Sequence, residues 1–348
     1  MSPPEVLVVG QGLAGSLLAL ELLDRGRRVL VVDADRPHAA SPVSAGMVNP
    51  IAGPKHNRPW AWDPFAGEAR ARYASLERRF GIRLVRERAI HFAFRSAEDR
   101  ERFLARDDHD ALAPHLGEIH APGTLAPELA DEHGGFEILG AFALDVPALL
   151  RATRAELLAR GAFRPVAVAV EGADGDPLGD GTRPDTTVLC TGHHAASAGP
   201  FRRLPWRVSR GERLDVRLLS TPPRTILNRE KWLLPLEDDR AQIGAIYAWD
   251  DAEAGPTEKG RRELETAGRA IGASDFEVVD HRAGARAGGI DWRPYLGRAA
   301  DRSEIAILGG LGSKGALYAP GCARRLAEHL FEGAALDPEL DVARRRPR

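Results

Sequence analysis

The stretch Val6-Leu7-Val8-Val9-Gly10-Gln11-Gly12-Leu13-Ala14-Gly15 decides the fold of the first part of the chain. Its apolar run is typical of a buried parallel strand, and it leads into the pattern Gly-x-Gly-x-x-Gly. A helical pattern follows from Leu13 to about Arg25, and a second apolar run, Val29 to Val32, ends in Asp33. Strand, glycine turn, helix, strand and acid in this order indicate dinucleotide binding. The motif leaves both NAD and FAD open.

Each position of this fingerprint has a physical reason. Gly10 permits the tight turn, Gly12 lets the backbone approach a pyrophosphate, and Gly15 lets the helix and the sheet pack closely. The pyrophosphate then lies against the amide groups at the positive end of the helix. Asp33 can accept hydrogen bonds from a ribose hydroxyl. The alternative is an ordinary βαβ unit whose glycines serve packing only.

The composition sets the class of protein. At 348 residues, with 43% hydrophobic residues, the chain is long enough for two domains with separate cores. A net charge of −2 argues against a nucleic-acid surface as the main partner. The sequence contains no signal peptide and no apolar run near the length of a membrane span, so we expect a cytoplasmic protein without a membrane span.

The hydrophobic periodicity predicts alternating helices and strands along the chain. A loop over 36–60, rich in Pro, Ser, Ala and Gly, is long enough to be functional. Asp145 is expected to cap a helix that ends before Gly161. Helices are predicted at 65–80, 146–160, 256–271 and 316–331, strands at 89–94, 163–170, 187–192, 213–218, 231–235, 241–247, 277–284 and 305–308, and an exposed turn-rich tip at 171–185.

A second strand, glycine loop and helix unit lies near the end of the chain. The apolar run Ile305 to Leu308 is followed by Gly309-Gly310-Leu311-Gly312-Ser313-Lys314-Gly315 and then by a helical pattern. Its backbone amides can bind an anion or a carbonyl oxygen. NAD enzymes have no general need of such a unit, whereas the flavin of FAD must be held far from its pyrophosphate. The second unit therefore favours FAD, and glycines chosen for packing are the alternative.

Five segments resemble the D-amino acid oxidase (DAO) superfamily of FAD-dependent amine oxidases, with a pattern like that of glycine oxidase and sarcosine oxidase. The chain is also similar to the flavin domain of the bacterial enzyme that matures 5-carboxymethylaminomethyl-uridine in tRNA. The segments follow the family's order along the whole chain. They are Gly10 to Gly15, Ser44-Ala45-Gly46-Met47, Val188 to Gly192 with Val208-Ser209-Arg210-Gly211-Glu212, Ala283-Gly284-Ala285-Arg286 with Asp291 to Gly297, and Gly310 to Gly315 running into Ala319-Pro320.

The resemblance implies an α/β (α+β) fold with two interleaved domains. One is a Rossmann-like FAD-binding domain of the p-hydroxybenzoate hydroxylase or glutathione reductase-2 type, and the other is a substrate domain on a mixed sheet. The FAD-binding domain would take residues 1–62, 140–215 and 285–340, and the substrate domain 63–139 and 216–284. No cysteine lies where sarcosine-type relatives attach their flavin, so we expect non-covalent FAD.

The same resemblance implies the residues that would hold FAD. Asp33 stands where the family more often has Glu, which is a mild departure. By expected role, they are Gly10, Gly12, Leu13, Ala14 and Gly15 for the pyrophosphate, Asp33 for the adenosine ribose, Ser44, Ala45, Gly46 and Met47 beside the flavin, Val166 for the adenine, Thr191 and Gly192 on the pyrophosphate side, and Gly310, Gly312, Ser313, Lys314 and Gly315 for the flavin pyrimidine.

Arg286 is the principal substrate candidate. In amino-acid-oxidising relatives this position supplies an arginine that binds the substrate carboxylate, and guanidinium pairs with carboxylate through two hydrogen bonds. The family usually has Pro after this arginine, but here Ala287 follows it, and a neighbouring arginine is an alternative. Lys314 occupies a position that is often basic in relatives and would hold the flavin or the substrate carboxylate.

Aromatic residues are expected to wall the substrate pocket. Trp232 and Tyr247 fall where relatives place side chains over the flavin, with ordinary core packing as the alternative. From the early loop, His56, Asn57 and Trp60 are further candidates to reach the pocket.

We expect neither a metal site nor a disulfide framework. His193 and His194 follow a strand-ending glycine, but adjacent side chains should diverge and no acidic partner is evident. Cys190 and Cys322 lie in apolar surroundings and are expected to be buried and unreactive.

The resemblance implies oxidation of a C–N bond in a small amine or amino acid. Hydride would pass to flavin N5, and the imine would be hydrolysed in water. Such chemistry requires orientation more than a side-chain base, in agreement with the lack of a catalytic triad. The electrons would go to oxygen or to another acceptor, and oligomerisation is possible.

Four alternatives stay open. One is a dehydrogenase of the same superfamily that acts on a 2-hydroxy acid or uses a non-oxygen acceptor. Another is a tRNA-modifying enzyme, and a third is a non-catalytic flavoprotein or a biosynthetic tailoring flavoenzyme with a bulky substrate. Trp232 and the missing proline at Ala287 favour a substrate other than glycine. An NAD enzyme is the least favoured.

Overall fold

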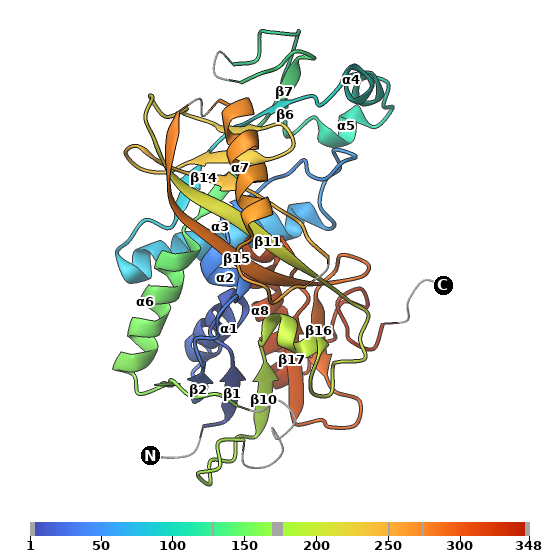
Figure 1. Ribbon diagram of the computed structural model, residues 1–348. Helices are drawn as coiled ribbons and strands as arrows, with labels where there is room; N and C mark the ends of the chain where they lie inside the picture. The colour runs from blue at the N-terminus through green and yellow to red at the C-terminus, as the bar shows by residue number, and fades with distance from the viewer. Residues whose placement is uncertain (1–3, 127–128, 169–176, 250, 273–274, 345–348) are drawn as a thin grey trace.

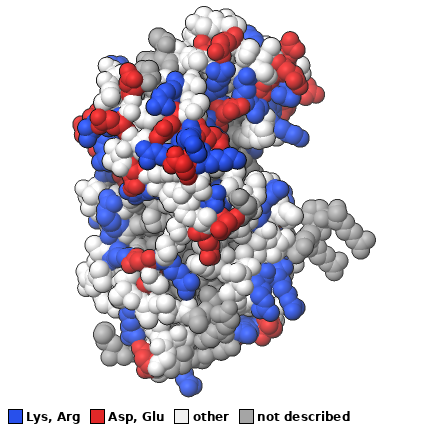
Figure 2. All heavy atoms as spheres, in the orientation of Figure 1, with Lys and Arg blue, Asp and Glu red and all other residues white. Residues whose placement is uncertain are grey.

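The computed structural model describes residues 4–126, 129–168, 177–249, 251–272 and 275–344. Two large sheets form its two ends, as Figure 1 shows. The parallel strands β1, β2, β10 and β17 stand at one end, and the long strands β11 and β15 cross above them. Acidic and basic side chains are interspersed over the face seen in Figure 2. Among the described helices, none has the length and apolarity that a membrane crossing requires.

The six-stranded sheet carries the opening fingerprint. Its order is β16-β17-β10-β1-β2-β9, and only β16 runs antiparallel to its neighbour. Successive side chains of β1 enter two different cores, so both faces of this strand are buried, as in other parallel sheets. The strands are β1 (Val6–Val9), β2 (Val29–Val32), β9 (Phe163–Arg164), β10 (Thr186–Leu189), β16 (Tyr295–Arg298) and β17 (Ile305–Gly309).

The eight-stranded sheet has the order β15-β11-β14-β13-β12-β5-β7-β6. Neighbours are antiparallel except for the parallel pair of β5 and β12. Helix α7 packs its Leu264 against one face, onto Leu214 and Ile243. The strands are β5 (Ile90–Ala93), β6 (Leu116–His120), β7 (Gly135–Ile138), β11 (Trp206–Leu218), β12 (Ile226–Asn228), β13 (Trp232–Pro235), β14 (Arg240–Gly244) and β15 (Phe276–Gly289).

A small sheet and the helices complete the fold. Helices α1 and α8 pack together over the parallel sheet in the largest hydrophobic core. The small sheet consists of β3 (Met47–Val48), β8 (Phe142–Leu144) and β4 (Val85–Glu87). The helices are α1 (Leu13–Asp24), α2 (Ala40–Val43), α3 (Trp62–Phe80), α4 (Ala97–Leu104), α5 (His109–Leu112), α6 (Val146–Ala159), η2 (Gly192–Ala196), α7 (Glu258–Ala270) and α8 (Gly315–Glu332).

Several local predictions are confirmed. The Asp145 carboxylate accepts a hydrogen bond from the Ala148 amide at 2.9 Å and so caps α6. Cys190 and Cys322 are free and buried, and burial raises the pKa of the Cys190 thiol to about 12. The five predicted helices are present with ends shifted by at most a few residues.

The predicted bounds of several strands were wrong. β11 begins at Trp206 rather than at 213, and β15 continues to Gly289, because their glycine-, alanine- and arginine-rich ends pair with each other without any apolar alternation. β14 ends at Gly244, and β9 is only two residues long. Of the strand expected at 163–170 and the tip expected at 171–185, residues 169–176 lie outside the described part of the chain.

The division into two domains stays a prediction. Strands β11 and β15 belong to the eight-stranded sheet along their whole length, yet they cross the expected boundaries at 215 and 285.

Gly15 and Gly67 provide a matched test of the fingerprint's packing, because both lie in helices. A Cβ at Gly15 would meet the carbonyl oxygen of Gly10 at 1.8 Å, whereas a Cβ at Gly67 would meet nothing within 4 Å. We expect Gly15→Ala to lower the free energy of unfolding by about 1–3 kcal/mol or more, and Gly67→Ala to raise it by about 0.5–1 kcal/mol. Urea unfolding of the two variants measures both changes in the free energy of unfolding. Equal changes would contradict the close packing of Gly15 against Gly10.

Candidate active site

One cavity of about 1430 Å³ is lined by residues of both large sheets. It opens beyond the carboxyl ends of β1, β2, β10 and β17, where Val9, Val32, Cys190 and Gly309 line it. Ligands of open α/β sheets bind at this edge. All the residues predicted for the cofactor line this cavity except Gly15, which packs under Gly10 instead.

The opening glycine loop forms one end of the cavity. Gly12 is the N-cap of α1 and has no side chain that could cap the helix. The Leu13 amide donates a hydrogen bond to Ser41 Oγ at 2.9 Å, which holds the early loop against the helix. Gly10 has a φ of 103°, and a Cβ there would lie 2.5 Å from the carbonyl oxygen of Cys190. The turn therefore requires glycine and leaves the end of α1 open to an anion.

Asp33 follows β2 and faces the same cavity. Its carboxylate accepts hydrogen bonds from the backbone amides of Gln11 and Asp35. These contacts fix the carboxylate beside the glycine turn, where the predicted ribose contact requires it.

The late glycine loop is held against β15. The Gly312 amide donates to the carbonyl oxygen of Ala287 at 2.9 Å, directly after Arg286. Gly310 has a φ of 71°, and a Cβ there would lie 2.9 Å from the Tyr295 ring. The predicted flavin loop and the predicted substrate arginine are therefore joined by the backbone.

These features fit FAD. A helix N-terminus with a glycine at its N-cap and a second glycine loop face one continuous cavity, which suits a cofactor with a pyrophosphate and a distant ring. Residues 44–47 line the same cavity between the two loops.

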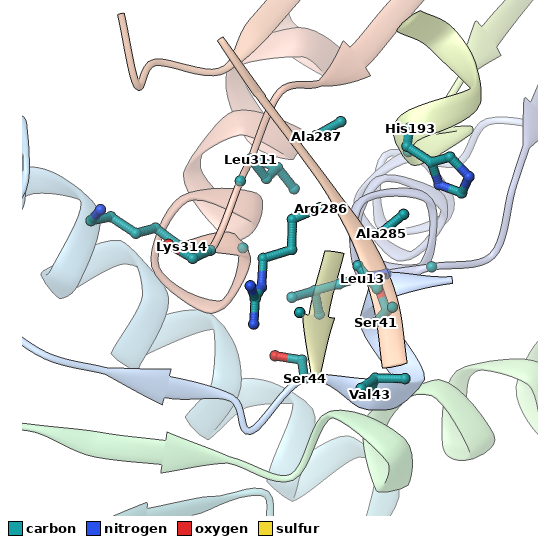
Figure 3. Close-up of a pocket in the computed structure, with 18 of the residues that line it drawn as sticks. Leu13, Ser41, Val43, Ser44, His193, Ala285, Arg286, Ala287, Leu311 and Lys314 are labelled. Carbon is teal, nitrogen blue, oxygen red and sulfur yellow. Dashed lines mark hydrogen bonds between the residues drawn. The ribbon is translucent and has the colours of Figure 1, made fainter. Parts of the chain in front are cut away.

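Arg286 points from β15 into the cavity (Figure 3). Its Cζ lies 4.3 Å from the centre of the Tyr247 ring, and Nη1 donates to the carbonyl oxygen of Ile246 at 3.4 Å. A Cβ on Gly211 would come within 2.1 Å of Cζ, so this glycine makes room for the guanidinium. Within the described ranges, no carboxylate forms an ion pair with Arg286.

Lys314 lies at the start of α8 and lines the same cavity. Its burial lowers the pKa of the ammonium group, because desolvation disfavours the charged form. The described part of the chain supplies it with no ion-pair partner. Arg286 and Lys314 are therefore cations that border the cavity without a carboxylate partner among the described residues.

Trp232 and Tyr247 both line the cavity, as predicted. The indole of Trp232 covers Gly244, where a Cβ would approach it to 2.3 Å. Tyr247 is half exposed and lies against Arg286.

The prediction for Trp60 was wrong, whereas His56 and Asn57 do line the cavity. Trp60 packs against Phe65 and Tyr318, because its indole completes the core beneath α3 and α8. His56 is buried among phenylalanine rings and lies 3.3 Å from Asp99.

The reasons for excluding a metal at His193 and His194 were also wrong. The tight turn of η2 brings the two ring centres to 4.0 Å, and Glu253, distant in sequence, lies 3.0 Å from His193 Nε2. The possible donor atoms of the three residues lie within 4.8 Å of one another. The expectation of no metal itself stays a prediction.

Comparison with known proteins decides the family. The model of the DAO family, described as FAD dependent oxidoreductase, matches residues 5–329. The chain belongs to this family. It is therefore an FAD-dependent oxidoreductase, and FAD is its cofactor.

Two curated relatives of this oxidoreductase carry the same description. The tRNA 5-methylaminomethyl-2-thiouridine biosynthesis bifunctional protein MnmC of Aeromonas hydrophila is 26% identical over 94% of this chain and 56% of its own length. The protein of the same name from Burkholderia mallei is 27% identical over 90% of this chain and 49% of its own length. The chain spans about half the length of these relatives.

Solved structures confirm the fold of the oxidoreductase. Glycine oxidase from Geobacillus kaustophilus superposes with a TM-score of 0.80, 20% identity and 99% coverage of both chains. Iminodiacetate oxidase from Chelativorans sp. BNC1 gives a TM-score of 0.77 with 23% identity, covering 95% of this chain and 96% of its own.

Some residues that line the cavity were not predicted from the sequence. Ser41 carried no signal beyond its place in the long early loop, and Arg213 was one arginine among many. The register of β11 places Arg213 on the cavity side, and this register depends on tertiary pairing.

We expect the oxidoreductase to purify with FAD that is not covalently attached. Denaturation in acid followed by precipitation should leave the flavin in the supernatant, where chromatography identifies it as FAD. Flavin that stays with the precipitated protein would contradict the expectation.

Proposed function

We propose that this oxidoreductase oxidises a C–N bond in a small amine or amino acid that carries a carboxylate. The observation that carries the proposal is the Arg286 guanidinium, which points into the cavity, has no carboxylate partner among the described residues and lies beside the loop expected to hold the flavin.

The charges favour an anionic substrate. Arg286 and Lys314 border the same cavity, and their partial burial strengthens an ion pair with a bound carboxylate. The planar guanidinium would bind this carboxylate through two hydrogen bonds and so orient the rest of the molecule. Gly211 and Tyr247 hold the guanidinium in place from two sides.

The cavity wall supplies orientation. Trp232 and Tyr247 would restrict the rotation of the bound amine and exclude water from it. FAD, when bound, supplies the acceptor for the hydride that leaves the substrate carbon. No side-chain base is required by this proposal, and the imine product would be hydrolysed in water. A cytoplasmic location, the electron acceptor and the oligomeric state stay predictions.

Modification of tRNA is a second candidate, because the curated relatives carry that description over nearly the whole of this chain. The net charge of −2 argues against an extended nucleic-acid surface, and acidic and basic side chains are interspersed on the face seen in Figure 2. A gel shift with tRNA at low salt tests this candidate, and salt-sensitive binding would support it.

Anaerobic bleaching of the flavin tests the proposed chemistry. We expect amino acids or N-alkyl glycines to reduce the flavin, and the matching amines without a carboxylate or the matching 2-hydroxy acids to reduce it poorly. Arg286→Met should weaken the apparent affinity for the best substrate by about tenfold or more, because a charge-assisted hydrogen-bond pair is lost.

Gly211→Ala is the matched control for this experiment. Its Cβ would displace the guanidinium while Arg286 keeps its chemistry, and the displaced group is the flexible end of a side chain. We expect weaker substrate affinity with little change in the unfolding midpoint or the FAD content. Unchanged affinity in both variants would exclude Arg286 as the carboxylate-binding group.

The lowered pKa of Lys314 predicts a pH dependence. Its charge is lost as the pH rises through a pKa below the ordinary 10.5, so carboxylate affinity should fall by up to about tenfold per pH unit there, until only Arg286 contributes. Acetate serves as the probe because it does not titrate in this range, and the perturbation of flavin absorbance reports its binding.

Two variants isolate the role of Lys314. Lys314→Arg keeps its charge and should remove the pH dependence, whereas Lys314→Met should bind acetate weakly at every pH. A wild-type affinity that stays constant up to the ordinary lysine pKa would contradict the prediction.

A further inference from the structure

Among the other arginines that line the cavity, Arg213 stands out, and the proposed reaction does not use it. Arg213, in the middle of β11, is 4% exposed and lines the cavity. Its Nε and Nη1 atoms are buried and have no hydrogen-bond partner in the described part of the chain. Buried polar groups in native proteins are nearly always paired, so these two donors require an explanation.

The neighbouring carboxylate does not satisfy Arg213. Asp215 Oδ1 lies 3.3 Å from Nη1, but the contact lacks hydrogen-bond geometry. The other oxygen of Asp215 lies 3.1 Å from Nε of Arg282, so this carboxylate is shared between two cations. Desolvation lowers the pKa of Arg213, which means that the surroundings do not offset the burial of its charge.

The strand register places Arg213 and Arg286 on one face. Gly211 and Arg213 are two positions apart on β11, so their side-chain directions coincide and they lie roughly 7 Å apart. The Arg286 guanidinium occupies the space above Gly211. Arg213 and Arg286 therefore lie on the same face of the sheet, and both residues line the cavity.

The third element of this wall is Trp232. It lies in register with Gly244 on β14, and Gly244 in turn lies opposite Arg213 on β11. The indole covers Gly244 and so provides an apolar surface next to Arg213. A low local dielectric strengthens the attraction between Arg213 and an anion.

We propose that Arg213 forms a second anion subsite, so that the substrate is a small amine or amino acid with two carboxylates. One carboxylate would bind Arg286 and Lys314, and the other would approach the incompletely paired guanidinium of Arg213 from the cavity. The inference rests on the proposed function, because it assigns the second end of the same substrate.

Matched ligand pairs test the subsite on the FAD-loaded protein. Succinate and butyrate have the same carbon number and differ in one carboxylate, and neither contains an amine that could be oxidised. Titration of the flavin absorbance gives their dissociation constants. We expect succinate to bind at least about tenfold more tightly than butyrate, because it forms an additional ion pair with Arg213.

Substitutions assign the preference to Arg213. Arg213→Met should bring the succinate-to-butyrate ratio close to one and leave butyrate binding unchanged, and Arg213→Lys should keep part of the preference. Arg282→Met is the control, because this arginine also contacts Asp215 but is largely exposed and does not line the cavity. It should keep the wild-type ratio. Should Arg213→Met fail to fold, the succinate-to-butyrate ratios of Arg213→Lys and of the wild type still test the subsite.

Two results would overturn the assignment. One is equal binding of succinate and butyrate by the wild type, and the other is a parallel loss of both ligands in Arg213→Met, which indicates a structural role only.

Anaerobic bleaching with iminodiacetate and N-methylglycine separates this inference from the proposed function. Bleaching by both with equal apparent affinity supports amine oxidation and overturns the subsite. A succinate preference without bleaching by any amine supports the subsite and overturns amine oxidation.

Discussion

The antiparallel ladder between β11 and β15 sets the positions of the groups that we propose to meet the substrate. It pairs Ser209 with Arg286 and Arg213 with Arg282. Because side chains alternate along a strand, a shift of the register by one residue would turn the cavity-facing guanidinium groups to the opposite face, onto α7. Because Gly211 has no side chain, the guanidinium of Arg286 can occupy the space next to it. Pairing, alternation and one missing Cβ together define this wall of the cavity.

The same ladder links the two glycine units. Its β15 strand ends where the late loop docks through the hydrogen bond from Gly312 to Ala287, and that loop leads into α8, which packs on α1 of the opening unit. The proposed cofactor and substrate ends of the cavity are thus connected by a backbone hydrogen bond and by two helices packed in the hydrophobic core. Such a connection suits a reaction that depends on orientation.

Charge is distributed unequally over the molecule. On the face seen in Figure 2, acids and bases are mixed, and many charged side chains of the molecule form ion pairs, as Arg79 does with Glu156 and Asp24. In the cavity wall, Arg286 and Lys314 lack such partners among the described residues, and Arg213 has an incomplete one. Buried cations without partners cost stability, and native proteins retain such violations mainly at functional sites.

The sequence alone determined the parts that depend on local geometry. The glycine spacing, the buried strands and the Asp145 cap follow from the conformations and hydrogen bonds of neighbouring residues, and the structure contains all of them. Only the tertiary structure decided which distant side chains meet. Arg213 lies in the cavity wall, Trp60 lies outside it, and Glu253 lies beside His193. Strand pairing and core packing bring these residues to their positions, and no local sequence pattern connects them. Contacts of this kind depend on the whole fold, and a single sequence carries no local signal for them.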